Sequence, residues 1–425
     1  MTTTLALAKT AFDVLQERGF VYQCSDEAGL RKHLAGGPIS VYCGFDPTAA
    51  SMHIGHLVQV MGLAHFQRAG NRPIALVGGG TAMIGDPTDK TSARRIMPVE
   101  ELDANAAAIK RQLSRFLDFS ETSEHPDGAA IMADNAEWLR RLNYIEFLRD
   151  YGRYFSVNEM LRMETYRTRL ETGLSFLEFN YALLQGYDFL ELYRRHGCTL
   201  QIGGSDQWSN MLAGADLIRK CEGAETYVLT HHLITDASGE KMGKTSASGQ
   251  LWLDPQLTSP FDYFQFWVNV DDADVARMLA IFTFLPIEEI RDLTAAMGEA
   301  LRPAKQRLAY EATALVHSEA EANRAQAAAR RLFGGASLEE IAAADDVPSI
   351  AVERGRLAAG VGAADLLVEA GLADSKGAAR RLIEQGGAYL NKERLALRPV
   401  TEQDLIEGAL VLQAGRKRFV RVVAA

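Results

Sequence analysis

The stretch that decides the fold runs from Tyr42 to His56 and reads YCGFDPTAASMHIGH. The residues from Ile39 to Phe45 are apolar and β-prone, the sequence Asp-Pro-Thr then breaks the run, and an apolar pattern with helical spacing begins at Leu57. We therefore expect a strand, a turn and a helix. In an open parallel sheet such a turn lies at the carboxyl edge, where ligands bind and where the first N–H groups of the helix point toward them.

Two histidines, His53 and His56, stand three residues apart at the expected helix start, with Gly55 between them. Helix capping is the commoner role for an isolated pair of this kind, but imidazoles beside a glycine also suit a nucleotide triphosphate at a helix N-terminus. The tetrapeptide resembles the His-Ile-Gly-His motif of class I aminoacyl-tRNA synthetases, and the Tyr-Cys-Gly-Phe-Asp-Pro-Thr before it is similar to the tyrosyl-tRNA synthetase version. Nucleotidylyltransferases carry the same class of tetrapeptide, so a second motif must decide.

That second motif is the segment GEKMGKTS, residues 239–246, in a loop rich in Gly and Ser. A flexible loop with two lysines three apart can place positive charge where phosphate charge develops, although an ordinary surface loop explains either lysine alone. The segment is similar to the Lys-Met-Ser-Lys-Ser signature of class I synthetases, with Gly243 and Thr245 replacing two serines as in bacterial-type tyrosyl enzymes. The resemblance spans essentially the whole chain, and the catalytic residues it implies are Thr48, His53, His56, Lys90, Arg94, Lys241, Lys244 and Thr245.

A Gly-rich turn after the strand expected near residues 199–202 points to a ribose site. Gly204 and its glycine neighbour permit close approach of a ligand to the backbone, and Asp206 can accept hydrogen bonds from ribose hydroxyls. The pattern Gly-Gly-x-Asp-Gln is shared with tryptophanyl-tRNA synthetases, so it supports the superfamily more than the substrate. The residues that the resemblance assigns to ATP are Cys43, Gly44, Asp46, Gly55, Gly204, Asp206, Leu233, Ile234 and Lys244.

Three polar residues, Tyr181, Gln185 and Asp188, share one face of an expected helix because they are spaced four and three apart. A solvated polar face would explain them equally well. In the tyrosyl family, the matching Tyr and Gln hold the amino end of the substrate, and the matching Asp binds the phenolic hydroxyl together with Tyr42. A pocket built for that hydroxyl leaves polar groups unpaired when phenylalanine enters, and this family is the standard example of such discrimination.

Asp86 follows a second expected strand, residues 73–77, and a run of glycines. A turn before Pro87 is the ordinary role of an Asp-Pro pair, whereas a buried carboxylate at that place needs a cation such as an ammonium group. The resemblance implies that Asp86 binds the α-amino group of the substrate. The residues that it assigns to the tyrosine site are Tyr42, Asp86, Tyr181, Gln185, Asp188 and Gln207.

Composition is that of an ordinary globular protein. The chain has 425 residues, 47% of them apolar and 24% charged, which predicts roughly three domains. No apolar run is long enough to span a membrane and the amino terminus does not resemble a signal peptide, so we expect a cytoplasmic protein. The four cysteines are scattered, which predicts free thiols and no structural metal.

Charge is unevenly distributed, because residues 351–425 carry 12 Lys or Arg against 9 Asp or Glu while the whole chain has a net charge of -10. A basic module on an acidic body fits local contact with phosphates, although a solvated charged helix is an equal alternative. The segment resembles the S4 RNA-binding domain. The residues expected to contact RNA are Lys376, Arg380, Arg381, Arg416, Lys417 and Arg418.

The expected fold class is α/β, with a Rossmann-like, doubly wound parallel-sheet catalytic domain, an α-helical domain and a small α+β S4-like domain. The expected ranges are 1–249 for the catalytic domain, with a helical insertion at about 134–175, then 250–335 for the helical domain, 336–355 for a linker and 356–425 for the S4-like domain. By resemblance, the insertion carries a homodimer contact and the helical domain contributes to anticodon binding.

The resemblance implies a ligase that activates L-tyrosine with ATP to tyrosyl-adenylate and pyrophosphate, and then transfers tyrosine to the 3′ end of tRNA(Tyr). Mg²⁺ is expected to accompany ATP, held mainly by its phosphates, without a tightly bound protein metal. A tryptophanyl ligase is one alternative, because it shares the nucleotide site. An RNA-binding protein with a decayed ligase core is another, against which the intact histidines and lysines of the two motifs argue.

Overall fold

The computed structural model describes residues 9–88, 97–120, 128–235, 250–415 and 418–425. The chain divides into two compact units. The first contains the chain up to Thr258 together with Val270–Ala304, and the second contains Ser259–Asn269 and Lys305–Ala425.

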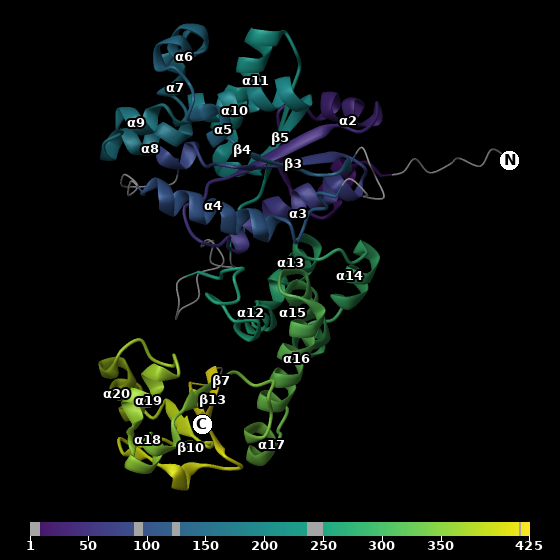
Figure 1. Ribbon diagram of the computed structural model, residues 1–425. Coiled ribbons are helices and arrows are strands. Elements are labelled where there is room, and N and C mark those ends of the chain that lie inside the picture. Colours follow the sequence, from purple (N-terminus) through teal and green to yellow (C-terminus); the bar gives the residue numbers. More distant parts are fainter. Residues whose placement is uncertain (1–8, 89–96, 121–127, 236–249, 416–417) are drawn as a thin grey trace, which may run out of the picture. The chain divides into compact units, whose positions relative to one another are not determined.

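A six-stranded sheet forms the centre of the described part of the first unit (Figure 1). Its strands are β1 (Val21–Cys24), β2 (Ser40–Phe45), β3 (Arg72–Val77), β4 (Ile131–Asp134), β5 (Cys198–Gly204) and β6 (Tyr227–His231). The order is β1-β6-β5-β2-β3-β4, and all neighbours are parallel except β1, which pairs antiparallel with β6. The direction of winding reverses between β2 and β5, as in a doubly wound sheet, so the predicted fold class is confirmed.

Helices cover both faces of this sheet, and this explains why its central strands are apolar throughout. In Figure 1, α3 (Ile54–Arg68) and α4 (Val99–Leu113) lie on one side of the sheet, and α10 (Tyr181–His196) and α11 (Trp208–Glu222) lie on the other. Five of the six residues of β3 are buried, as expected for a strand covered on both faces. Phe189 and Leu190 of α10 join Tyr42 and Ile74 in one apolar cluster, which ties the helix to the strands.

Short helices complete the first unit. The helices before β2 are α1 (Ala11–Glu17) and α2 (Glu27–Ala35), and those after β6 are α13 (Val275–Phe282) and α14 (Ile287–Leu293). Between β4 and α10 come α5 (Ala136–Leu139), α6 (Tyr144–Asp150), α7 (Val157–Met160), α8 (Glu164–Thr172) and α9 (Phe176–Phe179). The region predicted as a helical insertion at about 134–175 is therefore helical.

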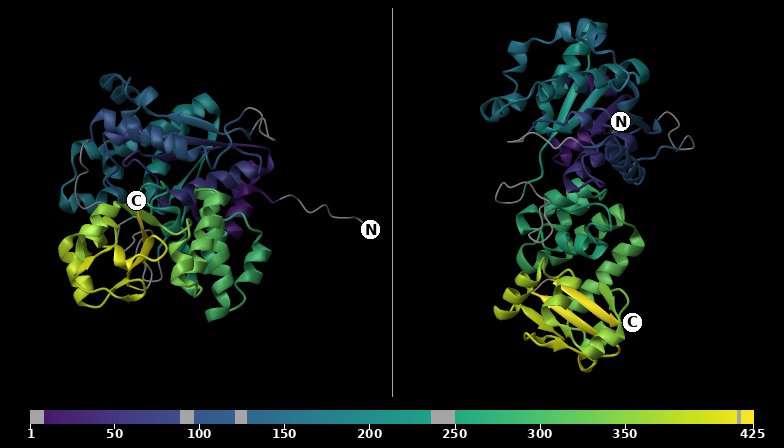
Figure 2. Two further views of the ribbon diagram at one scale, coloured as in Figure 1. Left: turned by 60° about the horizontal axis from the view of Figure 1, so that its bottom comes forward. Right: turned by 60° about the vertical axis from the view of Figure 1, so that its left-hand side comes forward.

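The second unit begins with helices and ends with a separate sheet. Its helices are α12 (Pro260–Val268), α15 (Arg302–Val316, whose first turn belongs to the first unit), α16 (Glu319–Phe333), α17 (Leu338–Ala342), α18 (Arg354–Ala359), α19 (Ala363–Glu369) and α20 (Lys376–Glu384). The strands β7 (Ser349–Val352), β9 (Ala388–Leu390), β10 (Glu393–Arg394), β12 (Ala409–Ala414) and β13 (Arg418–Ala424) form a sheet in the order β10-β9-β12-β13-β7. The right-hand view of Figure 2 shows its long strands in yellow. A second, two-stranded sheet pairs β8 (Val361–Gly362) with β11 (Pro399–Val400).

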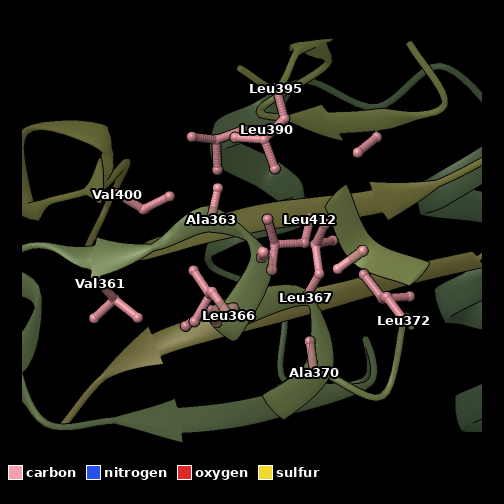
Figure 3. Packing of buried hydrophobic residues seen from close by; sticks show 14 of the residues in the cluster. Val361, Ala363, Leu366, Leu367, Ala370, Leu372, Leu390, Leu395, Val400 and Leu412 are labelled. Carbon is pink, nitrogen blue, oxygen red and sulfur yellow. The ribbon is translucent and has the colours of Figure 1, made fainter. Parts of the chain in front are cut away.

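The core of this C-terminal sheet is built from α19 and the strands. Leu366 and Leu367 of α19 belong to the same buried cluster as Leu412 of β12 and Leu390 of β9 (Figure 3). The predicted strand pair around Asn391 is present as β9 and β10, and both Asn391 and Lys392 have positive φ angles, 51° and 66°, as a two-residue hairpin turn requires. The predicted small α+β region is thus confirmed.

The residues expected to form a linker, 336–355, contain α17 and β7. β7 pairs in parallel with β13, with Ser349 opposite Arg421, and the guanidinium of Arg421 donates a hydrogen bond to the carbonyl of Ala344. This segment is therefore part of the C-terminal sheet in the structure. The short, half-exposed β7 has no clear alternation of polar and apolar residues that would identify it as a strand.

The N-terminal edge strand β1 is a second element that the sequence did not predict. It has only four residues, and two of them are exposed, so it lacks a continuous apolar run.

Within the residues that the structure describes, none of the helices is both long and apolar enough to cross a membrane.

Candidate active site

A cavity of about 220 Å³ lies at the point where the winding of the first sheet reverses. Its walls come from the carboxyl ends of β2 and β5, the start of α3, the loop after β3 and the first half of α10. A doubly wound sheet binds its ligands at this switch point, because the loops after the two central strands part there. The predicted strand, turn and helix around residues 42–56 are present, and they form one wall of this cavity.

The structure brings most of the predicted site residues together in this cavity. Those that line it are Tyr42, Cys43, Gly44, Asp46, Thr48, His56, Asp86, Tyr181, Gln185, Asp188, Gly204, Asp206 and Gln207. The predicted residues that the structure describes but that do not line the cavity are His53, Gly55, Leu233 and Ile234. Lys90, Arg94, Lys241, Lys244 and Thr245 lie outside the described residues.

Asp188 is a buried carboxyl group of the cavity with a strongly raised pKa. Its residue is only 2% exposed, and it accepts hydrogen bonds from Asn135 Nδ2 at 2.8 Å and Trp138 Nε1 at 2.7 Å. Burial raises the pKa of Asp188 from 3.8 to about 8, although the hydrogen bonds from Asn135 and Trp138 act in the opposite direction. The two donors fix both carboxylate oxygens, so this side chain is held ready for a further polar partner.

Tyr42 faces the same part of the cavity from β2. Its residue is 1% exposed and its hydroxyl has no hydrogen-bond partner among the described residues. Burial raises the pKa of Tyr42, with the nearby Asp188 as the second cause, so its hydroxyl stays protonated and can donate. Gln185 Oε1 and Gln201 Oε1 are also buried without a partner in the described structure. Buried polar atoms are rarely left unpaired, so this group indicates a pocket for a polar ligand.

Asp46 connects the α10 side of the cavity with the loop after β3. Its carboxylate accepts hydrogen bonds from Tyr181 Oη at 2.8 Å and from Thr81 Oγ1 at 2.7 Å. A Cβ atom on Gly78 would lie 1.9 Å from Asp46 Oδ1, so a glycine is required there to admit this carboxylate. The close run of glycines after β3 thus accommodates the protein's own side chains, and Gly78 also lines the cavity.

Asp86 and Gln207, which were predicted to serve the same end of the substrate, contact each other. Gln207 Nε2 donates to Asp86 Oδ2 at 2.7 Å, and Asn210 Nδ2 donates to Gln207 Oε1 at 3.2 Å. The other oxygen of Asp86 accepts from the backbone N–H of Thr88 at 2.9 Å. The carboxylate therefore both starts the turn before Pro87 and lines the cavity.

The histidine pair caps the N-terminus of α3. His53 Nδ1 accepts a hydrogen bond from the N–H of Gly55 at 3.0 Å, and His56 Nδ1 accepts one from the N–H of His53 at 3.2 Å. A ring nitrogen that accepts a hydrogen bond carries no proton, so each neutral ring has its proton on Nε2 and presents an N–H donor there. A Cβ on Gly55 would lie 2.8 Å from His53 Cε1, so this glycine makes room for the imidazole that caps its own helix.

Asn135 and Trp138, which hold Asp188, were not predicted from the sequence. Asn135 directly follows β4 and Trp138 lies in α5, both near the carboxyl edge of the sheet where polar residues reach a ligand. This position was a signal that could have identified them. Gln201, in the middle of β5, gave no such signal, because a single polar residue in an apolar strand does not reveal which way it faces.

The predicted RNA-binding residues differ in their surroundings. Arg380 and Arg381 are exposed on α20, and Lys376 at its start forms an ion pair with Asp365 at 2.5 Å. Arg418 donates instead to the carbonyls of Gly371 and Leu372, which gives it a structural role between β13 and the end of α19. Arg416 and Lys417 lie outside the described residues.

The part of the chain that the structure describes contains no group of three or more His, Cys, Asp or Glu side chains that could hold a metal ion. All four cysteines are free.

Two family models match the chain. The model for class I tRNA synthetases of the W and Y type matches residues 34–334, and the model for the SYY-like C-terminal domain of tyrosine–tRNA ligases matches residues 339–422.

Curated relatives and a solved structure agree with these models. The tyrosine–tRNA ligase of Caldanaerobacter subterraneus subsp. tengcongensis is 49% identical over 417 residues, covering 97% of this chain and 99% of the relative. That of Acetivibrio thermocellus is 49% identical over 415 residues, covering 97% and 99%. The C-terminally truncated mitochondrial tyrosyl-tRNA synthetase of Aspergillus nidulans superposes with a TM-score of 0.69 at 31% identity, covering 76% of this chain and 94% of that one.

Proposed function

Since the chain belongs to the class I tyrosyl- and tryptophanyl-tRNA synthetase family and joins tyrosine to tRNA, we propose that the cavity between β2 and β5 holds tyrosine and ATP while they react. The observation that carries this assignment is the buried Asp188 beside the unpartnered hydroxyl of Tyr42. A phenolic hydroxyl placed there would donate to Asp188 and accept from Tyr42. Both buried groups would then be satisfied, which phenylalanine could not achieve.

The amino end of tyrosine would lie toward Asp86. A carboxylate positioned by Gln207 suits an ammonium group, because the charge-assisted hydrogen bond is stronger than one between neutral groups. Tyr181 and Gln185 lie one turn apart on α10 and line the same cavity, so they can accept from the remaining ammonium protons.

ATP would lie along the β2–α3 turn and the Gly-rich end of β5. We assign the ribose to Gly204 and Asp206, and the adenine side to Leu233 and Ile234 as the resemblance implies. The remaining residues assigned to ATP are Cys43, Gly44, Asp46 and Gly55. The N-terminus of α3, which His53 and His56 cap, lies at this turn, and the positive end of the helix dipole would favour the phosphates.

The chemistry needs no covalent intermediate with the protein. The tyrosine carboxylate attacks the α-phosphorus of ATP and the bond to the bridging oxygen breaks, so pyrophosphate leaves and tyrosyl-adenylate remains. A ribose hydroxyl at the 3′ end of tRNA(Tyr) then attacks the tyrosyl carbonyl, and AMP leaves. Catalysis would rest on orientation and on donors to the developing phosphate charge, such as Thr48 and the Nε2–H groups of His53 and His56.

Two lysine-bearing segments outside the described residues complete this proposal on the strength of the resemblance alone. Lys241, Lys244 and Thr245 would contact the β- and γ-phosphates, and Lys90 and Arg94 would reach the departing pyrophosphate. Mg²⁺ would enter with ATP as part of the substrate, held by phosphate oxygens that suit this hard cation.

The second unit would hold tRNA. We propose that residues 356–425 act as an S4-like RNA-binding domain, with the exposed Arg380 and Arg381 of α20 placed against backbone phosphates. The helices within 250–335 would contribute to anticodon binding, and residues 1–249 would carry the catalytic site. Ligation of tyrosine to tRNA serves protein synthesis, so we place the protein in the cytoplasm.

A homodimer is the proposed assembly, formed through the helical segment between β4 and α10. Large apolar side chains are exposed along this segment, namely Tyr144, Ile145, Val157, Leu161, Leu170, Phe176 and Leu177. A surface of this kind marks a contact between proteins. Phe176, which is 70% exposed, should be replaceable by Asp without unfolding, and sedimentation should then show monomers; persistent dimers would reject this surface.

Amino-acid-dependent ATP–pyrophosphate exchange tests the cavity assignment. The wild-type protein should exchange with tyrosine far more efficiently than with phenylalanine or tryptophan. Tyr42→Phe should narrow the preference for tyrosine over phenylalanine, because it removes one partner of the phenol. An unchanged preference would show that the phenolic hydroxyl binds elsewhere.

A further inference from the structure

The first turn of α10 is capped by a residue from another helix. Tyr166 of α8 is fully buried, its hydroxyl donates to the carbonyl of Phe179 at 3.0 Å, and it accepts from the N–H of Ala182 at 3.2 Å. Ala182 is the second residue of α10, so its N–H has no acceptor within the helix. The preceding Asn180 does not cap the helix with its side chain. The hydroxyl of Tyr166 therefore takes the place of a capping side chain.

One turn further along α8, Arg169 fixes the short helix α9. It is 2% exposed, and its Nη2 donates to both oxygens of Glu178, at 2.9 and 3.0 Å. Its Nη1 donates to Thr172 Oγ1 at 2.9 Å, and Ser175 Oγ donates to Glu178 Oε2 at 2.7 Å. A buried ion pair with this many partners allows only one arrangement of the chain around it, because any displacement leaves a buried charge unpaired.

These contacts end where the cavity begins. Tyr166 and Arg169 are three apart and share one face of α8, so together they hold the junction between α9 and α10. Tyr181 opens α10, and its hydroxyl donates to Asp46 at 2.8 Å. Gln185 follows one turn later and also lines the cavity. Neither Tyr166 nor Arg169 lines it, so any effect of theirs on the substrate must pass through α10.

We propose that Tyr166 is a positioning residue for the amino-acid site, which sets Tyr181 and Gln185 against the ammonium end of tyrosine by capping α10. The pair formed by Arg169 and Glu178 supports it by fixing α9. The inference rests on the proposed role of Tyr181 at that end of the substrate. A purely structural role for Tyr166 would lower stability without a selective effect on tyrosine, so the two roles have different signatures.

The test is Tyr166→Phe, which removes the capping hydroxyl and keeps the ring, measured by steady-state ATP–pyrophosphate exchange on the full-length protein. The KM for tyrosine should rise about five-fold, the factor that corresponds to one ordinary hydrogen bond. The KM for ATP should change by less than about two-fold, because Asp46 keeps its hydrogen bond from Thr81.

The matched control is Tyr187→Phe, which removes a buried hydroxyl from α10 itself. Tyr187 is also buried, and its hydroxyl donates to Glu191 Oε1 at 2.8 Å, away from the cavity. It should lower the melting temperature as much as Tyr166→Phe does and leave the KM for tyrosine unchanged. A similar rise in KM in both variants would overturn the proposal, because loss of stability alone would then explain the effect.

Two further variants separate the inference from its premise. Tyr181→Phe should raise the KM for tyrosine; if it does not, the role proposed for Tyr181 is wrong and the inference falls with it. If Tyr181→Phe raises the KM and Tyr166→Phe does not, only the positioning role is overturned. Ser175→Ala, which weakens the support of Glu178, should raise the KM in the same direction by a smaller factor, and no rise would remove α9 from the proposal.

Discussion

The cavity around Asp188 and the exposed cations of α20 use polar side chains in opposite ways. Asp188 is almost fully buried and receives two hydrogen bonds from neighbouring side chains, whereas Arg380 and Arg381 stand on the surface. A buried group with fixed partners can recognise one hydroxyl, because any mismatch leaves it unpaired. Exposed cations attract any phosphate, and salt screens them. The comparison predicts large, substrate-specific effects in the cavity and small, salt-dependent effects on α20.

Removal of the whole C-terminal segment should produce the largest effect on tRNA. A chain that ends after Gly335 loses α17 to α20 and the sheet they accompany. The efficiency of tRNA charging should fall by about 10²-fold or more, because several phosphate contacts disappear together. ATP–pyrophosphate exchange with tyrosine should remain within about two-fold of the full-length protein, since it does not involve tRNA. Loss of exchange would show that the two regions are not separable.

Asp188→Asn should produce the next largest effect, confined to tyrosine. The substitution keeps the shape of the side chain but replaces one carboxyl oxygen by an NH2 group, which donates hydrogen bonds and cannot accept the phenolic hydroxyl. The kcat/KM for tyrosine in exchange should fall by about 10²-fold, because buried donors are then left without an acceptor. Binding of tRNA, measured by filter retention, should not change. Equal losses in both assays would contradict the division between the two regions.

Arg380→Ala should have a much smaller effect. The KM for tRNA should rise about five-fold. A plot of the logarithm of tRNA affinity against the logarithm of salt concentration should also become less steep by about one, because one phosphate contact is lost. Arg356→Ala is the control, because the guanidinium of Arg356 already donates to both oxygens of Glu369, at 3.1 and 2.7 Å. If both variants raise the KM for tRNA equally, the overall positive charge of this region attracts tRNA, and the face of α20 has no special role.

The pKa of Asp188 predicts an effect on stability instead of activity, namely a change in the free energy of unfolding with pH. Burial raises this pKa from 3.8 to about 8, so between these values the folded protein holds a proton that the unfolded chain has lost. The free energy of unfolding should therefore fall as the pH rises from about 4 to about 8. Urea unfolding of the wild type and Asp188→Asn at pH 5 and pH 8 should show a steeper decline in the wild type. Parallel declines would mean that Asp188 is ionised throughout.

Much of the cavity could be predicted because its residues follow predictable elements. The spacing of apolar residues changes clearly from that of a strand in β2 to that of a helix in α3. The spacing of Tyr181, Gln185 and Asp188 is that of one helix face. The structure places all of these around one cavity. The role of each residue was inferred from the resemblance to tyrosyl-tRNA synthetases and not from residue spacing, and those roles stay predictions.

What could not be predicted depends on contacts between distant parts of the chain. The contact between Asn135 and Asp188 forms only because β4 pairs with β3, which brings the Asn135 amide within hydrogen-bond distance of α10. Gly78 must be a glycine because the carboxylate of Asp46, from the turn after β2, lies against it. Arg418 was expected to face RNA, but it donates to carbonyls at the end of α19. Neither local propensity nor charge reveals such partners.

The place of β7 has a practical consequence for work on isolated fragments. β13 is bonded to β12 on one side and to β7 on the other, and β7 precedes the segment 356–425 that resembles an RNA-binding domain. A fragment cut at residue 356 would expose the unpaired backbone groups of β13 along one edge. Such an edge is a template for pairing with other chains, so this fragment should self-associate, and one that starts before α17 should stay monomeric.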